Sequence, residues 1–365
     1  LALDAADQRR VEAWGRFVGA QRSGGVQREN ARALLVVPLD DAIAARPDLA
    51  ILHVFRGNVL RQLDDEPGAR AAYARALAAV PHLREAQWAL AEADVKAWTE
   101  RPDTEPSDYT AAMSRLSREA GSRPAGDPAV DLATGILLYR QGEFAKARAR
   151  LDPIVAAWPV DETTATIAKL AARYEGAWSQ ELALRQRDDA KGDLPRVRIT
   201  TSKGPVLVEL FEDDAPNTTA NLVWLARAGF YDGTTFHRVV PFYIAQGGDP
   251  NSRTGKGIAG QGNPGYRIPT EPASKTGRRP FRGVIAMANS GKDTEGSQFF
   301  LTTATAGHLE DFTVFGRVLE GQENVERLVR GDRIEKVEII RAREHAYRPT
   351  TVGGTPAPAP VDASR

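Results

Sequence analysis

Apolar residues recur at helical spacing through the first half of the chain. Within residues 69–77, Tyr73 and Ala76 fall on one face of a helix. Arg70 and Arg75 are turned outward from that face. Residues 84–98, 109–120 and 131–139 show the same periodicity. Pro and Gly fall between these stretches, where helices begin and end. The pattern predicts that the first half of the chain is helical.

A repeat with fixed spacing runs through these helical stretches. Gly57, Ala69, Tyr73, Ala76 and Pro81 are spaced like Gly135, Ala147, Leu151, Ile154 and Pro159. Pro47 and Pro81 lie 34 residues apart. This resembles the tetratricopeptide repeat, a helix-turn-helix unit of about 34 residues. The resemblance implies that the small first residue lets two helices approach and that the final Pro ends the second. We therefore expect a repeat domain over residues 1–186, the alternative being a generic helical bundle with Ala-rich packing.

The pattern changes from helices to strands near residue 195. Residues 187–195 are polar and end in Pro, which predicts a linker. Two apolar runs follow, 197–200 and 205–210, and the turn residues between them indicate a hairpin.

Two further segments of this half have simple signals. Pro216 opens a helical stretch that Gly229 ends. Residues 344–365 are rich in Pro, Ala, Gly and Thr, and we predict a disordered tail there.

Composition narrows the function without naming it. The chain has 365 residues, which favours two or three domains. Lys plus Arg and Asp plus Glu both number 48, so the balance gives no support for a nucleic-acid partner. The absence of cysteine excludes disulfides, thiolate catalysis and zinc sites built on Cys. No apolar run is long enough to span a membrane. The chain begins Leu1-Ala2-Leu3 without Met, and on this ground we favour an exported protein of the periplasm or cell envelope over a cytoplasmic one.

Three pairs of segments in the second half form a recognisable set. They are Phe236–Pro241 with Gln246–Pro250, Met287–Gly291 with Gly296–Phe300, and Phe315–Val318 with Gly321. In order and spacing the set resembles the cyclophilin-type peptidyl-prolyl cis-trans isomerases. The resemblance covers residues 196–343. It implies a closed eight-stranded antiparallel β-barrel capped by two helices, at 215–229 and about 321–330.

The chemistry of this family needs few groups. Rotation about an X-Pro bond has a barrier of about 18–20 kcal/mol, because conjugation is lost in the twisted state. A typical turnover of about 10 per second requires roughly a thousandfold acceleration, or about 4 kcal/mol. No bond is broken, so no nucleophile, metal or cofactor is needed. A dry apolar slot for the proline ring and one cationic donor near the amide suffice.

The resemblance assigns roles to individual residues. It implies that Arg238 is the electrostatic catalyst and that Gln298 and Gln246 orient it and the peptide. The residues implied for the proline pocket, its rim and the adjoining groove are Tyr243, Ile244, Ala288, Asn289, Phe300, His308, Leu309 and Phe312. Without the surrounding motif, Arg238 would be interpreted as a strand arginine in a surface ion pair.

The chain departs from the family pattern at five places. Tyr243 replaces the usual Phe, and Ile244 replaces Met or Val. His308 stands where tight cyclosporin binding is associated with Trp, as in many bacterial members, so we expect weak drug binding. The segment 310–312 is one residue shorter than in many members. The stretch 258–279 is unusual in its length and in its Gly and Pro content.

Two functions remain open from the sequence. The first is a bacterial foldase or chaperone that isomerises X-Pro bonds in protein clients and binds clients or a protein partner through its helical repeats. The second is a weakly active adaptor that binds proline-containing segments. Docking of a chaperone tail on the repeats is disfavoured, because Val54 and Ala89 stand where such repeats carry Lys and Asn, and only Asn58 matches.

Overall fold

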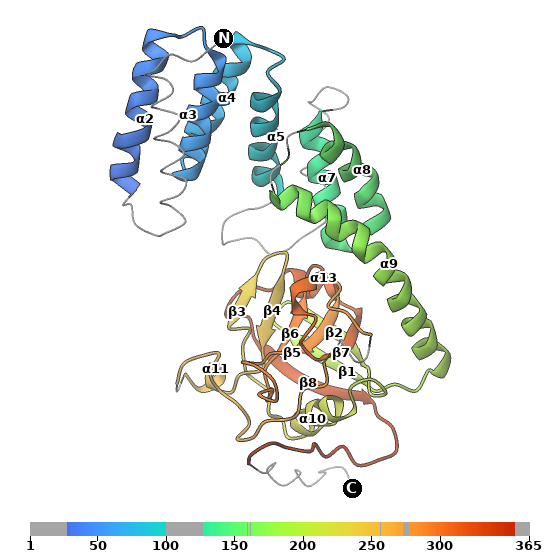
Figure 1. Cartoon of the computed structure of the whole chain (residues 1–365). Helices are drawn as coiled ribbons and strands as arrows, with labels where there is room; N and C mark the ends of the chain where they lie inside the picture. Colours follow the sequence, from blue (N-terminus) through green and yellow to red (C-terminus); the bar gives the residue numbers. More distant parts are fainter. Residues whose placement is uncertain are drawn as a thin grey trace. The chain divides into compact units, whose positions relative to one another are not determined.

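The computed structural model describes residues 28–99, 118, 127–158, 160, 162–255, 257–272 and 277–354 (Figure 1). Apart from residue 118, the helix predicted over 109–120 lies outside these residues, as do the outer parts of both termini. Contacts divide the chain into two compact units. One consists of Leu1–Glu100, Arg123–Ala133 and Pro153–Thr164, and the other of Arg101–Ser122, Thr134–Asp152 and Ala165–Arg365.

The first unit is helical. Its main helices are α2 (Arg28–Ala45), α3 (Ala50–Gln62), α4 (Glu66–Ala79) and α5 (Arg84–Thr99). Asp65 caps α4, because its carboxylate accepts a hydrogen bond from the Gly68 amide at 3.0 Å. Gly57 on α3 leaves no room for a Cβ, because the ring of Tyr73 on α4 lies directly against it. The predicted helices and this close approach are therefore present.

Helices α7 (Pro128–Gln141) and α8 (Phe144–Ala157) contribute to both units. Gly135 on α7 repeats the relation of Gly57, because a Cβ there would lie 2.6 Å from Leu151 Cγ on α8. The helix pairs α3–α4 and α7–α8 thus each have the same kind of packing contact, and both contacts occur at the predicted spacing. The structure establishes the helices and this contact, while the tetratricopeptide character stays a prediction.

An eight-stranded antiparallel sheet dominates the second unit. Its strands are β1 (Arg196–Thr201), β2 (Gly204–Leu210), β3 (Arg238–Val240), β4 (Ile244–Gly247), β5 (Val284–Met287), β6 (Phe299–Thr302), β7 (Val314–Glu320) and β8 (Ile334–Arg341). The order is β3-β4-β6-β5-β7-β2-β1-β8. The predicted hairpin is confirmed, since β1 and β2 pair up to Thr201 and Gly204. The sheet is curled, with β3 and β8 as its end strands, and a bridge joins Thr235 and Arg333 just before them. The predicted closure of the barrel is not established by strand pairing.

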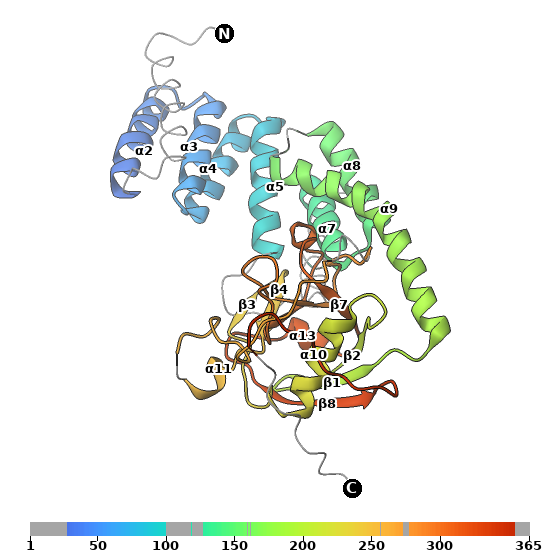
Figure 2. The ribbon, with the colours of Figure 1, turned by 60° about the horizontal axis from the view of Figure 1, so that its bottom comes forward.

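Short helices accompany the sheet. They are α10 (Pro216–Arg227), α11 (Asn251–Thr254), the 3-10 helix η1 (Gly307–Leu309) and α13 (Gln322–Glu326). Helix α10 lies against β8 (Figure 1, Figure 2). Its first amides are satisfied by Glu271, whose carboxylate accepts from Asn217 at 3.1 Å and Thr218 at 2.8 Å. Leu222 and Val223 of α10 join the buried core of the sheet.

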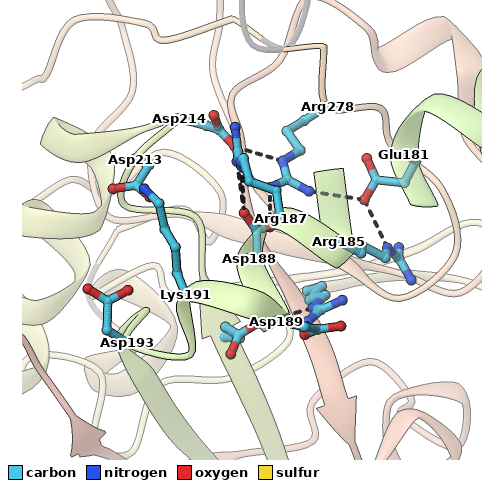
Figure 3. A network of polar contacts seen from close by, with 12 residues as sticks. Glu181, Arg185, Arg187, Asp188, Asp189, Lys191, Asp193, Asp213, Asp214 and Arg278 are labelled. Atoms are coloured by element: carbon cyan, nitrogen blue, oxygen red, sulfur yellow. Dashed lines mark hydrogen bonds and ion pairs between the residues drawn. The ribbon is translucent and has the colours of Figure 1, made fainter. Parts of the chain in front are cut away.

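A buried arginine, Arg278, links the 30-residue helix α9 (Glu162–Lys191) to the segment that follows β2. The Arg278 side chain has no exposed surface. Its Nε donates to Asp214 at 2.8 Å, and Nη1 donates to Glu181 at 3.4 Å (Figure 3). Nη2 donates to Asp188, and the guanidinium lies 3.6 Å from the centre of the Phe211 ring. Because Glu181 and Asp188 belong to α9, the unusual stretch 258–279 supplies the anchor of that helix.

The predicted linker is shorter than residues 187–195. Helix α9 continues through Lys191, so the boundary expected between 186 and 187 lies inside a helix. The polar residues that suggested a linker have partners: Arg187 donates to Asp214 at 2.7 Å and Lys191 to Asp213 at 2.7 Å.

The predicted tail is also partly ordered. The hydroxyl of buried Tyr347 donates to Glu212 at 3.0 Å, and the Val352 amide donates to the Arg267 carbonyl at 2.7 Å. Only residues 355–365 of the tail lie outside the described chain. Among the helices described, none has the length and apolarity needed to cross a membrane.

Candidate active site

Strand pairing brings the predicted polar site residues together. Arg238, the first residue of β3, pairs with Gln246 of β4, and Gln246 pairs in turn with Phe300 of β6. Side chains of directly opposed residues lie on the same face of a sheet. The register therefore places a cation, an amide and an aromatic ring in one row across three strands.

A chain of amides orients Arg238. Its Nη1 donates to Gln246 Oε1 at 3.4 Å, and Gln246 Nε2 donates to Gln298 Oε1 at 3.1 Å. Gln298 Nε2 then donates to the Gly262 carbonyl at 2.9 Å. Arg238 itself is exposed. The group that orients it is a neutral amide, so this contact leaves the guanidinium charge available to a substrate.

Asp249 supports this chain of amides and was not among the predicted site residues. It is fully buried, and its carboxylate accepts from the amides of Asn251 at 2.7 Å and Gly262 at 3.1 Å and from Gly260. Gln298 Nε2 lies 3.4 Å from its Oδ2. Asp249 therefore fixes the loop after β4 whose carbonyl holds Gln298. Its place in the motif after Gln246 was the signal that could have identified it.

The predicted pocket residues gather in one hydrophobic cluster. Ile244, Phe300 and Leu309 are buried in it, and Tyr243, Ala288 and Phe312 are partly buried against it. The rings of Phe300 and Phe312 meet edge to face with centroids 5.7 Å apart. The shorter segment 310–312 thus still brings Phe312 to the cluster.

Tyr243 lies where the cluster meets Arg238. The Arg238 guanidinium is 6.0 Å from the centre of the Tyr243 ring. Burial raises the pKa of Tyr243, although the charge of Arg238 opposes this, so the hydroxyl stays protonated near neutral pH. A neutral hydroxyl and a cation therefore stand together at the edge of an apolar surface.

The residues predicted to line the adjoining groove lie beside a buried acid. The Ala288 amide donates to the Gln298 carbonyl at 2.9 Å. The Asn289 side chain donates to Glu295 at 3.4 Å, and the Thr313 hydroxyl donates to the same carboxylate at 2.7 Å. Glu295 has no exposed surface, and burial raises its pKa to about 7. Glu295 was not among the predicted site residues, because nothing in the sequence around it distinguishes a buried carboxylate from an exposed one.

Two histidines, His308 and His237, belong to this part of the sequence. The side chain of His308 lies outside the described residues, so its predicted place on the rim stays a prediction. Burial lowers the pKa of His237, which is consistent with the structural role expected for it.

Known proteins resemble the second half of the chain. The family model for cyclophilin type peptidyl-prolyl cis-trans isomerase/CLD matches residues 196–344. A peptidyl-prolyl cis-trans isomerase of Helicobacter pylori is 44% identical over 142 residues, which are 38% of this chain and 83% of that protein. One of Synechococcus elongatus is 41% identical over 145 residues, or 39% and 94% of the two chains. The crystal structure of a Cryptosporidium parvum cyclophilin type isomerase aligns with 41% of this chain and 99% of its own, at 27% identity and a TM-score of 0.36.

Proposed function

The chain belongs to the cyclophilin type peptidyl-prolyl cis-trans isomerases, and we propose that it isomerises X-Pro bonds by electrostatic stabilisation of the twisted amide. The observation that carries this mechanism is the position of Arg238. Its guanidinium is oriented by Gln246 and stands beside Tyr243 at the edge of the apolar cluster. A cation and an apolar surface are the two elements that the reaction needs.

Arg238 acts on the transition state more than on either planar isomer. As the amide twists, conjugation with the carbonyl is lost and electron density returns to the prolyl nitrogen. A cationic donor stabilises that nitrogen more strongly in the twisted state, and only such a difference accelerates the reaction. A preorganised donor can supply a few kcal/mol of the required stabilisation. The amides of Gln246 and Gln298 preorganise it without neutralising its charge.

The apolar cluster accepts the proline ring. Ile244, Phe300 and Leu309 form its buried surface, and Phe312 closes one side. Burying the ring there holds the prolyl nitrogen near Arg238. We assign Ala288 and the backbone of Asn289 to the residues that precede the proline, and His308 to the rim.

The test is the isomerisation of a proline-containing tetrapeptide by the full chain. Arg238→Ala should lower kcat/KM by about tenfold to a hundredfold. Arg238→Lys should restore little, because an ammonium lacks the planar fork of the guanidinium. Arg198→Ala, at another exposed strand arginine, is the matched control and should be neutral. Full activity of a folded Arg238→Ala protein, with folding checked by circular dichroism, would refute the mechanism.

A second candidate is an adaptor that binds proline segments with little turnover. Tyr243 favours it, because a hydroxyl at the edge of the cluster makes the slot narrower and more polar. Tyr243→Phe separates the two candidates. An enzyme should keep or gain turnover with this variant, whereas an adaptor should bind the peptide by calorimetry without turnover in either form.

We also propose that the helices form tetratricopeptide-like repeats that bind clients or a partner, and that the sheet closes as a barrel. The shared contacts of Gly57 and Gly135 support the repeat, and the bridge of Thr235 with Arg333 supports closure. A protein substrate limited by X-Pro isomerisation, compared with the tetrapeptide, tests the binding role. A client-binding repeat should raise kcat/KM for the protein substrate above that for the tetrapeptide.

A further inference from the structure

One wall of the proline pocket is contacted by helix α9. The wall is the segment 303–312, which carries Leu309 and Phe312. The ring and hydroxyl of Tyr174 on α9 lie directly against Gly307, where no Cβ could fit. The preceding residue of α9 also contacts the wall, because Arg173 Nη2 lies 3.2 Å from Glu310. A helix outside the family match therefore contacts the residues on both sides of Leu309.

Tyr174 is held in place by an aromatic cluster. Its ring centroid lies 5.8 Å from Phe144 on α8 and 5.9 Å from Phe281, which is fully buried. Trp178, one turn further along α9, meets Phe281 edge to face at 4.8 Å. Such packing leaves Tyr174 little freedom to move away from Gly307.

The segment before β5 completes this support. Arg279 donates to Glu310 at 2.6 Å, and the Ala306 amide donates to the Pro280 carbonyl at 2.8 Å. The Phe281 carbonyl accepts from the Thr302 hydroxyl at 2.6 Å. The pocket wall is thus contacted both by α9 and by residues 279–281.

A second wall of the pocket, at Tyr243, is also contacted by a helix. Arg140 of α7 places its guanidinium 5.0 Å from the centre of the Phe242 ring. Phe242 has a positive φ of 53°, which few non-glycine residues adopt, and it directly precedes Tyr243. The Tyr243 carbonyl in turn accepts from the Thr303 amide at 2.9 Å, which joins the two walls.

From these contacts we infer that Tyr174, Arg173 and Arg140 are positioning residues that set the width of the proline pocket. The inference rests on the proposed function, because it concerns the pocket of that same reaction. None of the three touches the amide that twists. They act on the bound ground state and transition state alike, so their loss should raise KM and leave kcat nearly unchanged.

Tyr174 is tested first, in the full chain and with the tetrapeptide. Tyr174→Ala should raise KM at least about threefold with kcat within about twofold of wild type. Tyr174→Phe keeps the ring and should restore the wild-type KM. Leu151→Ala is the matched control, because Leu151 is equally buried and packs on Gly135 rather than on the pocket wall. It should lower the melting temperature without changing KM.

Arg173 provides a second variant that does not put folding at risk, since its side chain is 58% exposed. Arg173→Glu places a carboxylate beside Glu310 and should raise KM about twofold at low salt, with the effect lost at about 1 M salt. Arg173→Lys should behave as wild type. Unchanged KM values for both Tyr174→Ala and Arg173→Glu in an active protein would overturn the positioning role alone. A folded wild-type protein without turnover would instead overturn the proposed function.

Discussion

Arg278 and Arg187 bind the same two carboxylates. Arg278 donates to Asp188 and, at 2.8 Å, to Asp214, while Arg187 donates to them at 2.8 and 2.7 Å. The two arginines differ in environment, since the Arg278 side chain has no exposed surface and that of Arg187 is 39% exposed. The pair therefore offers an internal comparison of a buried and an exposed cation with the same partners.

Arg278→Ala should lower the free energy of unfolding by about 3–5 kcal/mol, because the buried Asp188 and Glu181 would lose their fully buried partner and keep only the partly exposed Arg187 and Arg185. Arg187→Ala should cost at most about 1 kcal/mol, because water replaces much of what an exposed ion pair provides. Urea unfolding followed by far-ultraviolet circular dichroism measures both. Equal costs for the two variants would show that burial of Arg278 does not decide the stability of this network.

Glu295→Gln should remove a pH dependence of stability. The folded-state pKa of Glu295 is raised to about 7 by burial, against an ordinary value of 4.5. Between these values the folded state keeps a proton that the unfolded state has released. The free energy of unfolding should therefore fall as pH rises from about 4.5 to about 7, by on the order of 3 kcal/mol.

The Gln variant cannot titrate and keeps the oxygen that accepts from Thr313. Its unfolding free energy should lack that fall, so the variant should gain stability relative to wild type as pH rises to 7. Urea titrations at several pH values provide the comparison. Parallel pH profiles of the two proteins would mean that Glu295 is ionised in the folded state throughout this range.

Gly135→Ala and Gly176→Ala should change stability in opposite directions. A Cβ at Gly135 would lie 2.6 Å from Leu151 Cγ, and such overpacking costs about 1–3 kcal/mol. A Cβ at Gly176, in the middle of α9, meets nothing within 4 Å. Alanine there should stabilise the helix by about 0.5–1 kcal/mol. Melting temperatures of the two variants test this, and a loss at both sites would mean that α9 requires glycine for another reason.

The sequence was sufficient for features that short segments encode. The helices follow from the spacing of residues such as Tyr73 and Ala76, and the hairpin follows from its turn residues. Arg238, Gln246 and Gln298 could be named because the family motif keeps them in order. Their contacts then follow from strand register, which places Arg238 opposite Gln246.

Features that depend on distant pairing could not be predicted in this way. Asp188 looked like a linker residue because its partner Arg278 lies 90 positions later in the chain. Tyr347 looked like part of a disordered tail because Glu212, which it contacts, lies 135 positions earlier. Polar residues indicate exposure by default, and only their partners show that they are buried. Glu295 was missed for the same reason.

The connection between α9 and β1 is short and held by side chains from elsewhere. Residues 191–193 are exposed, yet Arg341 donates to the carbonyls of Gly192 at 2.6 Å and Leu194 at 2.7 Å. Arg343 donates to both oxygens of Asp193. The backbone at Gly192 is therefore not what keeps the helix on the sheet. A protease that cut there should leave α9 bound to the sheet through Arg278 and the aromatic rings rather than through the chain.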